Sequence, residues 1–187
     1  MRYLALLRGI NVGTSGRIRM DALKRLLEEA EFCDVETYIQ SGNVLLSSDD
    51  TETAARETIE RALKDGAAIT TTAVLRTAQE LNAMIRNCPF SAESIAKAQA
   101  RNAEGESFYV CLLPQEPDAQ TLVKLSAVES QDDSFAVLGR DIYLLLGQSI
   151  RTSKLAIRLQ KLFPNMTVRN WNTITKLNEL AQRMNGG

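Results

Sequence analysis

The sequence predicts an α+β fold in which two ferredoxin-like βαββαβ subdomains follow one another in tandem. A strand–turn–strand pattern over residues 35–47 has a segment of helical periodicity on each side, and a further strand pattern lies beyond each helical segment. The same order of elements recurs about a hundred residues later. The predicted domains are a ferredoxin-like subdomain at 1–76, a helical connector at 77–106, and a second ferredoxin-like subdomain with a C-terminal helix at 107–187.

The predicted hairpin at the centre of the first half depends on its turn. Residues Val35–Ser47 read Val-Glu-Thr-Tyr-Ile-Gln-Ser-Gly-Asn-Val-Leu-Leu-Ser, with Gly42 and Asn43 between two β-rich runs. Glycine beside asparagine suits a tight hairpin turn, because both residues tolerate a positive φ. This segment is therefore predicted to supply the two middle strands of the first subdomain.

The outer strands of the first half are predicted at Tyr3–Leu7 and Ile69–Leu75, where apolar and β-branched residues cluster. Between the first strand and the first helix, a loop over Gly9–Met20 carries three glycines. Loops of this length are uncommon inside compact domains and are often functional.

The two helices of the first half are placed by their capping residues. Asp21 is predicted to cap the first helix, and Asp49 with Glu52 to form a capping box for the second, which Gly66 ends.

The elements of the connector and the second half are predicted in the same way, from capping residues and hydrophobic periodicity. Thr77 and Glu80 predict another capping box, and an alanine-rich helix and a loose linker continue to Glu106. The elements predicted in the second half are Phe108–Leu113, Asp118–Val128, Phe135–Leu138, Ile142–Leu146, Ser153–Phe163 and Met166–Arg169. A last helix is predicted over Thr173–Met184.

The composition excludes several kinds of catalytic site. Because the chain has no histidine, Ser-His-Asp and Cys-His machinery and histidine-ligated metal sites are excluded. No acid pair or Asp-rich metal motif is evident, so no metal site is predicted and the cofactor stays unknown. The formal net charge of −1 gives no global field for nucleic acid or a membrane.

The cysteines and the N-terminal segment favour the cytoplasm. Cys33, Cys88 and Cys111 lack C-x-x-C spacing and are predicted to be buried free thiols, as in a reducing compartment. The N-terminal apolar run is too short to span a bilayer, and Arg8 and Asn11 interrupt it where a signal peptide would continue. No membrane partner is therefore expected.

Positive charge gathers near both ends of the sequence. Before Glu28 the only carboxylate is Asp21, and from Ile142 to Asn178 there is none. The basic residues of these two segments are Arg2, Arg8, Arg17, Arg19, Lys24, Arg25, Arg151, Lys154, Arg158, Lys161, Arg169 and Lys176. If the segments meet, they form one basic face; the alternative is scattered, solvated charge.

The segment from Leu146 to Lys154 is the sharpest local motif. It runs from a predicted strand end through a glycine-containing loop to a predicted helix start, where unpaired N–H groups with Arg151, Ser153 and Lys154 would favour an anion. It is not a Walker A loop, because the second glycine is missing. The structural alternative is that Thr152 or Ser153 only caps the helix.

A second motif reads Arg169-Asn170-Trp171-Asn172-Thr173. Asn172 or Thr173 is predicted to cap the following helix, and Trp171 to bury its ring in the core. Arg169 and Asn170 have no such structural task and are kept as candidate ligand contacts.

The third candidate group lies in the first half. Arg8 ends the first predicted strand, and Asn11 belongs to the long loop. Asn43 is also a candidate, although a role in the turn is the favoured interpretation.

Aromatic residues support nucleic-acid binding only weakly. RNA-recognition motifs stack bases on aromatics of two central strands. Here the first strand offers Tyr3 and the third offers none, and the aromatics of the second half lack the glycine–aromatic signature of that motif.

Three motifs together resemble the bacterial domain-of-unknown-function 1697 family. They are residues 5–13 (Ala-Leu-Leu-Arg-Gly-Ile-Asn-Val-Gly), 37–44 (Thr-Tyr-Ile-Gln-Ser-Gly-Asn-Val) and 167–173 (Thr-Val-Arg-Asn-Trp-Asn-Thr). The resemblance covers nearly the whole chain and implies an α+β fold with ferredoxin-like subdomains. Where the family often shows another glycine directly after Gly13, this sequence has Thr14-Ser15-Gly16. The resemblance implies no activity.

The leading functional hypothesis is a module that binds a small anionic ligand, such as a nucleotide or a phosphorylated metabolite. The predicted contacts are Arg8, Asn11, Asn43, Arg151, Ser153, Lys154, Arg169 and Asn170. The alternatives are an RNA- or DNA-associated protein that uses the same face, and a non-catalytic protein-interaction module. In an enzyme, Lys154 or Tyr38 would have to supply acid–base chemistry.

Overall fold

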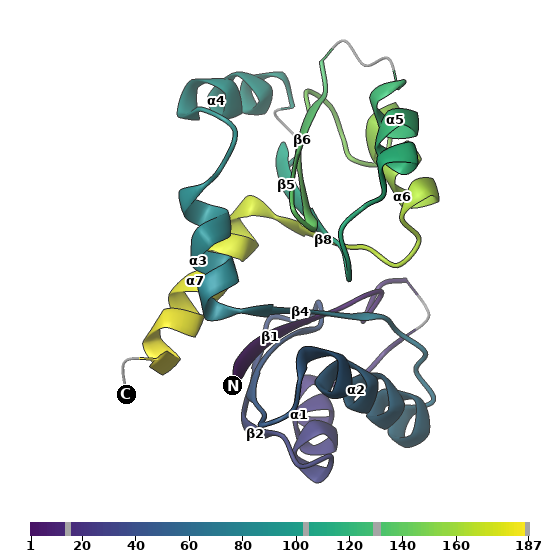
Figure 1. Cartoon of the computed structure of the whole chain (residues 1–187), viewed down its shortest axis with the longest axis vertical. Coiled ribbons are helices and arrows are strands. Elements are labelled where there is room, and N and C mark those ends of the chain that lie inside the picture. Colours follow the sequence, from purple (N-terminus) through teal and green to yellow (C-terminus); the bar gives the residue numbers. More distant parts are fainter. Residues whose placement is uncertain (14–15, 103–104, 129–131, 186–187) are drawn as a thin grey trace. The chain divides into compact units, whose positions relative to one another are not determined.

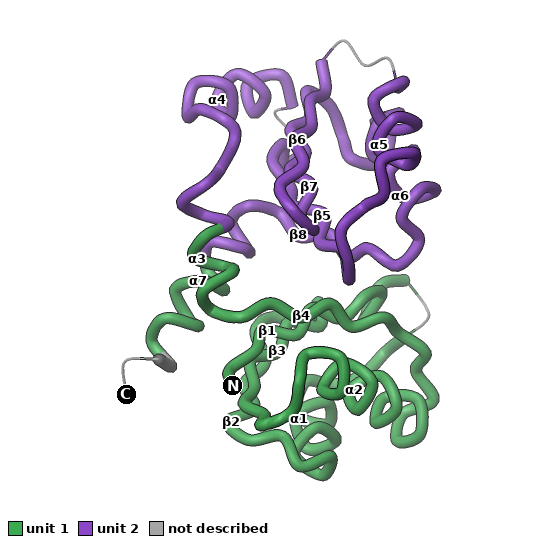
Figure 2. Tube along the Cα trace, in the orientation of Figure 1, with its two compact units in different colours: residues 1–83, 176–187 green, residues 84–175 purple. Residues whose placement is uncertain are grey.

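The computed structural model describes residues 1–13, 16–102, 105–128 and 132–185 (Figure 1). The chain divides into two compact units: unit 1 comprises residues 1–83 and 176–187, and unit 2 comprises residues 84–175 (Figure 2). The domain limits predicted from the sequence follow the order of elements and stay a prediction. The spatial division differs from them in that the chain beyond residue 176 clusters with unit 1.

Unit 1 is a four-stranded antiparallel sheet in the order β2-β3-β1-β4 with two helices on one face (Figure 1). Its elements are β1 (Arg2–Leu7), α1 (Met20–Glu29), β2 (Cys33–Tyr38), β3 (Asn43–Ser47), α2 (Glu52–Ala67) and β4 (Ala73–Thr77). The start of α3 (Ala78–Arg86) and the end of α7 (Trp171–Asn185) also belong to it. The core joins alternate strand residues, among them Ala5, Leu46 and Leu75, to Leu27 of α1 and Ile59 of α2.

Unit 2 has a second four-stranded antiparallel sheet, in the order β6-β7-β5-β8. Its elements are α4 (Ala92–Arg101), β5 (Phe108–Leu112), α5 (Ala119–Ser126), β6 (Ser134–Leu138), β7 (Asp141–Leu145), α6 (Lys154–Leu162) and β8 (Thr167–Asn170). Helices α5 and α6 cover one sheet face, and their core includes Cys111, Leu144, Leu125 and Leu159.

The α+β prediction is confirmed at this level: the described residues form two four-stranded antiparallel sheets and seven helices. The predicted capping box at the start of α3 is also present. The Thr77 N–H donates to a carboxylate oxygen of Glu80 (2.8 Å), and the Glu80 N–H donates to Thr77 Oγ1 (3.2 Å).

The predicted starts of α1 and α2 are wrong by two residues or fewer. Helix α1 begins at Met20 with Arg19 at the N-cap position and no side-chain cap, so Asp21 lies inside its first turn. Helix α2 is capped by Thr51, whose hydroxyl accepts from the Ala54 N–H (3.3 Å), rather than by a box at Asp49.

The predicted end of α2 and the following strand also need correction. Gly66 lies within α2, and the left-handed residue that ends the helix is Ala68, with φ of 55°. The last strand of unit 1 begins at Ala73 rather than Ile69, because the Ile69 N–H is bound to the Leu63 carbonyl at the helix end (3.1 Å).

The three cysteines are free thiols in different environments. Cys111 is buried, Cys88 is partly buried and Cys33 is exposed. The prediction that all three are buried is therefore wrong for Cys33, which occupies the start of edge strand β2. Among the described helices, none combines the length and the apolar composition that crossing a bilayer requires.

Candidate functional site

Asn11 organises the loop that joins β1 to α1. Its side-chain amide donates to the backbone carbonyls of Ile18 and Gln40 (2.9 Å each), and its Oδ1 accepts from the Ile18 N–H (2.9 Å). The Asn11 N–H donates to the Gly16 carbonyl (2.9 Å), and φ of Asn11 is 56°, a conformation that asparagine tolerates better than most residues. Asn11 therefore fixes the loop against the β2–β3 turn. Thr14 and Ser15, which were singled out from the sequence after Gly13, lie outside the described residues.

The β2–β3 turn is packed closely against the start of this loop. The Leu7 N–H donates to the Gly42 carbonyl (2.8 Å), and φ of Gly42 is 73°. A Cβ at position 42 would lie 2.9 Å from Cβ of Ile10 and 3.0 Å from that of Leu7. A side chain there would meet both a conformational and a steric penalty, which explains the glycine.

An open cleft of about 670 Å³ lies beside this loop in unit 1. Its wall comes from the loop, the first turn of α1 and the β2–β3 turn, through Asn11, Arg17, Ile18, Arg19, Met20, Asp21 and Gln40. This volume falls within the range of small-molecule sites.

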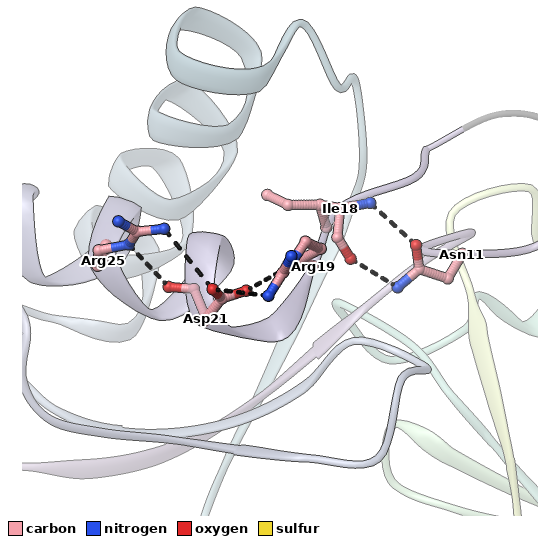
Figure 3. Close-up of polar contacts among 5 residues, drawn as sticks. All are labelled: Asn11, Ile18, Arg19, Asp21 and Arg25. Atoms are coloured by element: carbon pink, nitrogen blue, oxygen red, sulfur yellow. Dashed lines mark hydrogen bonds and ion pairs between the residues drawn. The ribbon is translucent and has the colours of Figure 1, made fainter.

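Among the described residues, the charged side chains that line the cleft are those of Arg17, Arg19 and Asp21. Figure 3 shows Asp21 between Arg19 and Arg25. Asp21 Oδ1 accepts from Arg19 Nε (3.1 Å), and Asp21 Oδ2 lies 3.7 Å from Arg25 Nη2. The Arg17 guanidinium donates to the Gly13 carbonyl (3.2 and 3.3 Å). Arg19 and Arg25 therefore pair with one carboxylate, while Arg17 lines the same cleft. The hydrogen bond from Arg19 holds the pKa of Asp21 below its usual value, so this carboxylate is ionised at neutral pH.

The cleft also contains the start of α1. The N–H groups of a first helical turn lack partners within the helix, and the helix dipole places partial positive charge there. Arg19 at the N-cap position has no acceptor in its side chain and makes no cap. The backbone and the arginines therefore favour an anion at the same place.

Of the three candidates predicted in the first half, only Asn11 lines this cleft. Asn43 is fully buried, and its amide donates to the Tyr38 carbonyl (3.1 Å) and Ser41 Oγ (2.9 Å), which makes it a turn residue. Arg8 is exposed just after β1, and its carbonyl accepts from Thr71 Oγ1 (2.8 Å). Sequence reasoning left Arg17 and Arg19 out of the site, although both stand in a long glycine-containing loop just before a helix.

The loop predicted to hold an anion in unit 2 already holds a carboxylate of the chain. Asp133, which precedes β6, is only 7% exposed. Its two carboxylate oxygens accept from the Gly147 N–H (3.1 Å), Gln148 Nε2 (3.0 Å) and the Ser153 hydroxyl (2.7 Å). Asp133 therefore accepts hydrogen bonds from several groups of the loop that was predicted to bind an anion.

The basic and hydroxyl groups of this loop have separate roles. Ser153 is fully buried and caps α6, since its Oγ accepts from the Ala156 N–H (3.0 Å). Arg151 and Lys154 are exposed beside it. The structural alternative is therefore observed for Ser153, while Arg151 and Lys154 face solvent.

The motif around Trp171 is also divided between structural tasks. Asn170, and neither of the two predicted residues, caps α7: its Oδ1 accepts from the Thr173 N–H (2.8 Å). Arg169 lies on the sheet face away from α5 and α6, opposite Val110, and donates to Thr167 Oγ1 (2.8 Å) and the Val168 carbonyl (2.9 Å). Burial lowers the pKa of Arg169 to about 10, which leaves it charged at neutral pH.

Trp171 is only partly buried, in contrast to its predicted place in the core. Its ring stacks on Phe108 with centroids 4.5 Å apart, and Tyr143 and Phe90 complete an aromatic cluster around Phe108. Tyr143 is held by a hydrogen bond from its hydroxyl to the Met84 carbonyl (3.0 Å).

Strand directions show which predicted residues lie together. Arg8, Asn11 and Asn43 follow or precede strand ends that share one end of the unit 1 sheet. Arg151, Ser153, Lys154, Arg169 and Asn170 likewise gather at one end of the unit 2 sheet, where β7 and β8 end. The eight predicted residues therefore form two groups, one in each unit. Within the described residues, no group of three or more Cys, Asp or Glu side chains is arranged to hold a metal ion.

Comparisons with known proteins identify the family and the fold. The family described as "Protein of unknown function (DUF1697)" matches residues 1–143. Among solved structures, the conserved bacterial protein SP0830 from Streptococcus pneumoniae is similar, with a TM-score of 0.77, 24% identity and coverage of 97% of this chain and 98% of that one. No curated protein matches the chain.

Proposed function

The chain belongs to the DUF1697 family of proteins of unknown function, and from its own geometry we propose that it binds a small anionic ligand at the cleft of unit 1. A nucleotide or a phosphorylated metabolite fits this description. The proposal depends on one observation: Arg19 and Arg25 pair with a single carboxylate, while Arg17 and the uncapped start of α1 line the same cleft.

The balance of charge supports a ligand that carries phosphate rather than one carboxylate. Asp21 occupies Arg19 and Arg25, whereas the described contacts of Arg17 are to a backbone carbonyl. Arginine pairs with phosphate through two parallel hydrogen bonds. A phosphate would thus be held by Arg17 and by the first-turn N–H groups of α1, and it would compete with Asp21 for Arg19.

Two exposed apolar side chains support a ligand with an apolar or planar part. Val12 and Ile39 are 67% and 49% exposed. They are the chain neighbours of Asn11 and Gln40, which line the cleft and are joined by a hydrogen bond. A base or another apolar group attached to the phosphate would cover this surface.

The test is a thermal-shift screen of nucleotides, phosphorylated metabolites and short oligonucleotides at two salt concentrations. Binding to the folded state raises the melting temperature. We expect Arg17→Gln and Arg19→Gln each to weaken binding by about tenfold, the loss typical of a charged hydrogen bond. Arg61→Gln, on the exposed side of α2, is the matched control and should leave the shift unchanged.

A substitution with the opposite effect makes the test sharper. Asp21→Asn removes the carboxylate that competes for Arg19 and Arg25, so anion affinity should rise by about fivefold. A shift that survives in both arginine variants and does not grow in Asp21→Asn would reject the cleft as the site. A shift seen only with oligonucleotides at low salt would favour the nucleic-acid alternative.

The second group of predicted contacts stays a proposal for unit 2. Arg151 and Lys154 are exposed and remain available, whereas Ser153 and Asn170 serve as helix caps. Lys154→Ala belongs in the same screen: if its shift equals that of the parent protein, the unit 2 group makes no contact with the ligand.

We further propose that each unit is ferredoxin-like and that the protein is cytoplasmic. In both units the element order β-α-β-β-α-β and the strand orders β2-β3-β1-β4 and β6-β7-β5-β8 support the first proposal. The free thiols of all three cysteines support the second.

A further inference from the structure

A second cleft, in unit 2, has a composition opposite to that of the first. Its volume is about 590 Å³, and it lies between α4, the segment before β5 and the start of α7. The side chains that matter here are Ile95 and Gln99 of α4, Glu106, Phe108, Trp171 and Asn172. This set joins an aromatic wall to a carboxylate and two amides, with no basic side chain in the lining.

Its aromatic wall is firmly placed. One side of the Trp171 indole stacks on Phe108, with centroids 4.5 Å apart and ring planes inclined by 24°. Phe108 is itself only 4% exposed and meets Phe90 edge to face, with centroids 5.7 Å apart. The partly exposed remainder of the indole therefore borders the cleft in a fixed orientation.

Within the described part of the chain, the carboxylate of the cleft is hydrogen-bonded but has no cationic partner. Glu106 accepts hydrogen bonds from the Asn172 side chain (3.3 and 3.4 Å). Among the described ion pairs, no lysine or arginine reaches it. Burial raises the pKa of Tyr109, and the nearby charge of Glu106 raises it further.

Hydrogen bonds from three side chains hold the segment that carries Glu106. Asn102 donates to the Glu106 and Gln148 carbonyls (2.8 and 3.1 Å), and Gln99 donates to the Gly105 carbonyl (2.8 Å). The Ser107 hydroxyl donates to the Ala98 carbonyl of α4 (3.3 Å). The backbone that carries the Glu106 carboxylate is therefore held in place next to the indole.

We propose that this cleft binds a small organic cation that bears an amine or a guanidinium group. The cation would lie against the face of Trp171, where tryptophan attracts cations most strongly among the aromatic residues, and would pair with Glu106. Gln99 and Asn172 would orient it through their amides. The volume matches a ligand of metabolite size, and the chemistry is opposite to that of the anion proposed for unit 1.

The chain offers a direct readout, because Trp171 is its only tryptophan. The probe is agmatine, which has a guanidinium at one end and an amine at the other; the neutral control is butylurea, which has a similar shape without charge. We expect agmatine to change the tryptophan fluorescence of the full chain in a saturable way, and butylurea to produce no saturable change.

Glu106→Gln keeps the size of the side chain and its bond with Asn172 but removes the charge, and should weaken agmatine binding by about tenfold. The control variant is Glu93→Gln, in the first turn of helix α4 and outside the cleft lining, and it should bind as the parent does.

The proposal is overturned by an unsaturable response to agmatine in the parent chain, by an equal response to butylurea, or by unchanged affinity in a folded Glu106→Gln variant. The comparison of the two probes needs no variant, so it decides the question even if Glu106→Gln does not fold. Because both probes lack an anionic group, the result does not depend on the cleft of unit 1.

Discussion

Ile39 has a backbone conformation that is unusual for its residue type. Its φ is 48°, in the left-handed region, and its side chain is nevertheless 49% exposed. A β-branched residue is strained in this region, because Cβ crowds the following carbonyl. Because the side chain is half exposed, its packing compensates for little of this strain. The residue lies beside the cleft proposed to bind an anion. Strain that is not compensated by packing is more common at functional sites.

Replacing Ile39 with glycine should stabilise the protein. Relief of the strain outweighs the greater flexibility of glycine in the unfolded chain, so the free energy of unfolding should rise by about 1 kcal/mol. Ile157→Gly is the matched control: Ile157 is 40% exposed in helix α6, and glycine there should cost about 0.5 kcal/mol. Urea denaturation of both variants measures whether each substitution raises or lowers the free energy of unfolding. A loss of stability in Ile39→Gly would show that the isoleucine side chain contributes more by packing than its exposure indicates.

At the residue scale, four residues that the sequence assigned to a ligand make structural contacts within the chain. Asn11, Asn43, Ser153 and Asn170 were predicted as ligand contacts, and each proves to hold a loop, a turn or a helix start. Amide and hydroxyl side chains at strand ends suit both purposes equally well. A structural role is distinguished from ligand binding only by the backbone groups that these side chains contact in the folded chain.

At the scale of elements, two serine caps of different burial offer a controlled comparison. Ser91 caps α4 from an exposed position by accepting from the Ser94 N–H (3.1 Å). Ser153 caps α6 while fully buried and also donates to the Asp133 carboxylate (2.7 Å).

Ser91→Ala should cost about 1 kcal/mol, the usual value of an N-cap. Ser153→Ala should cost about 2–3 kcal/mol, because it also leaves a buried carboxylate with one donor fewer. Chemical denaturation of both variants under the same conditions measures the difference. Equal losses would mean that water replaces the missing hydroxyl at Asp133.

Element types and their order were predictable, but several ends were not. Five polar residues precede α2, from Ser47 to Thr51, and each has a side chain that can cap a helix. The start of β4 was placed too early because Thr70–Thr72 also favour strands by propensity. Pairing with β1 sets the true limits, since Leu7 pairs with Ala73 and Tyr3 with Thr77. The pairing register between distant strands cannot be predicted from a local sequence pattern.

At the scale of the whole molecule, the buried thiol of Cys111 links stability to pH. Burial raises its pKa from 9.0 to about 12. The raised pKa means that this thiol's full contribution to stability is present below pH 9.0. Above that value the unfolded chain loses the proton and the folded chain keeps it, so stability falls by about 1.4 kcal/mol per pH unit until about pH 12.

This dependence can be isolated with a variant. The difference in unfolding free energy between the parent and Cys111→Ala should shrink by about 1.4 kcal/mol for each pH unit above 9.0. Cys33→Ala, at an exposed cysteine, serves as the control for replacing a cysteine with alanine. A constant difference for Cys111→Ala would mean that the thiol ionises without global unfolding.

The order of the chain within the two units has a consequence for synthesis on the ribosome. Unit 2 is one continuous stretch, residues 84–175, whereas unit 1 combines residues 1–83 with the chain from residue 176 onward. The strands of unit 1 are translated first, yet this unit waits for the residues from 176 onward to leave the exit tunnel. The unit whose translation begins first is therefore completed only after all of unit 2 has been translated.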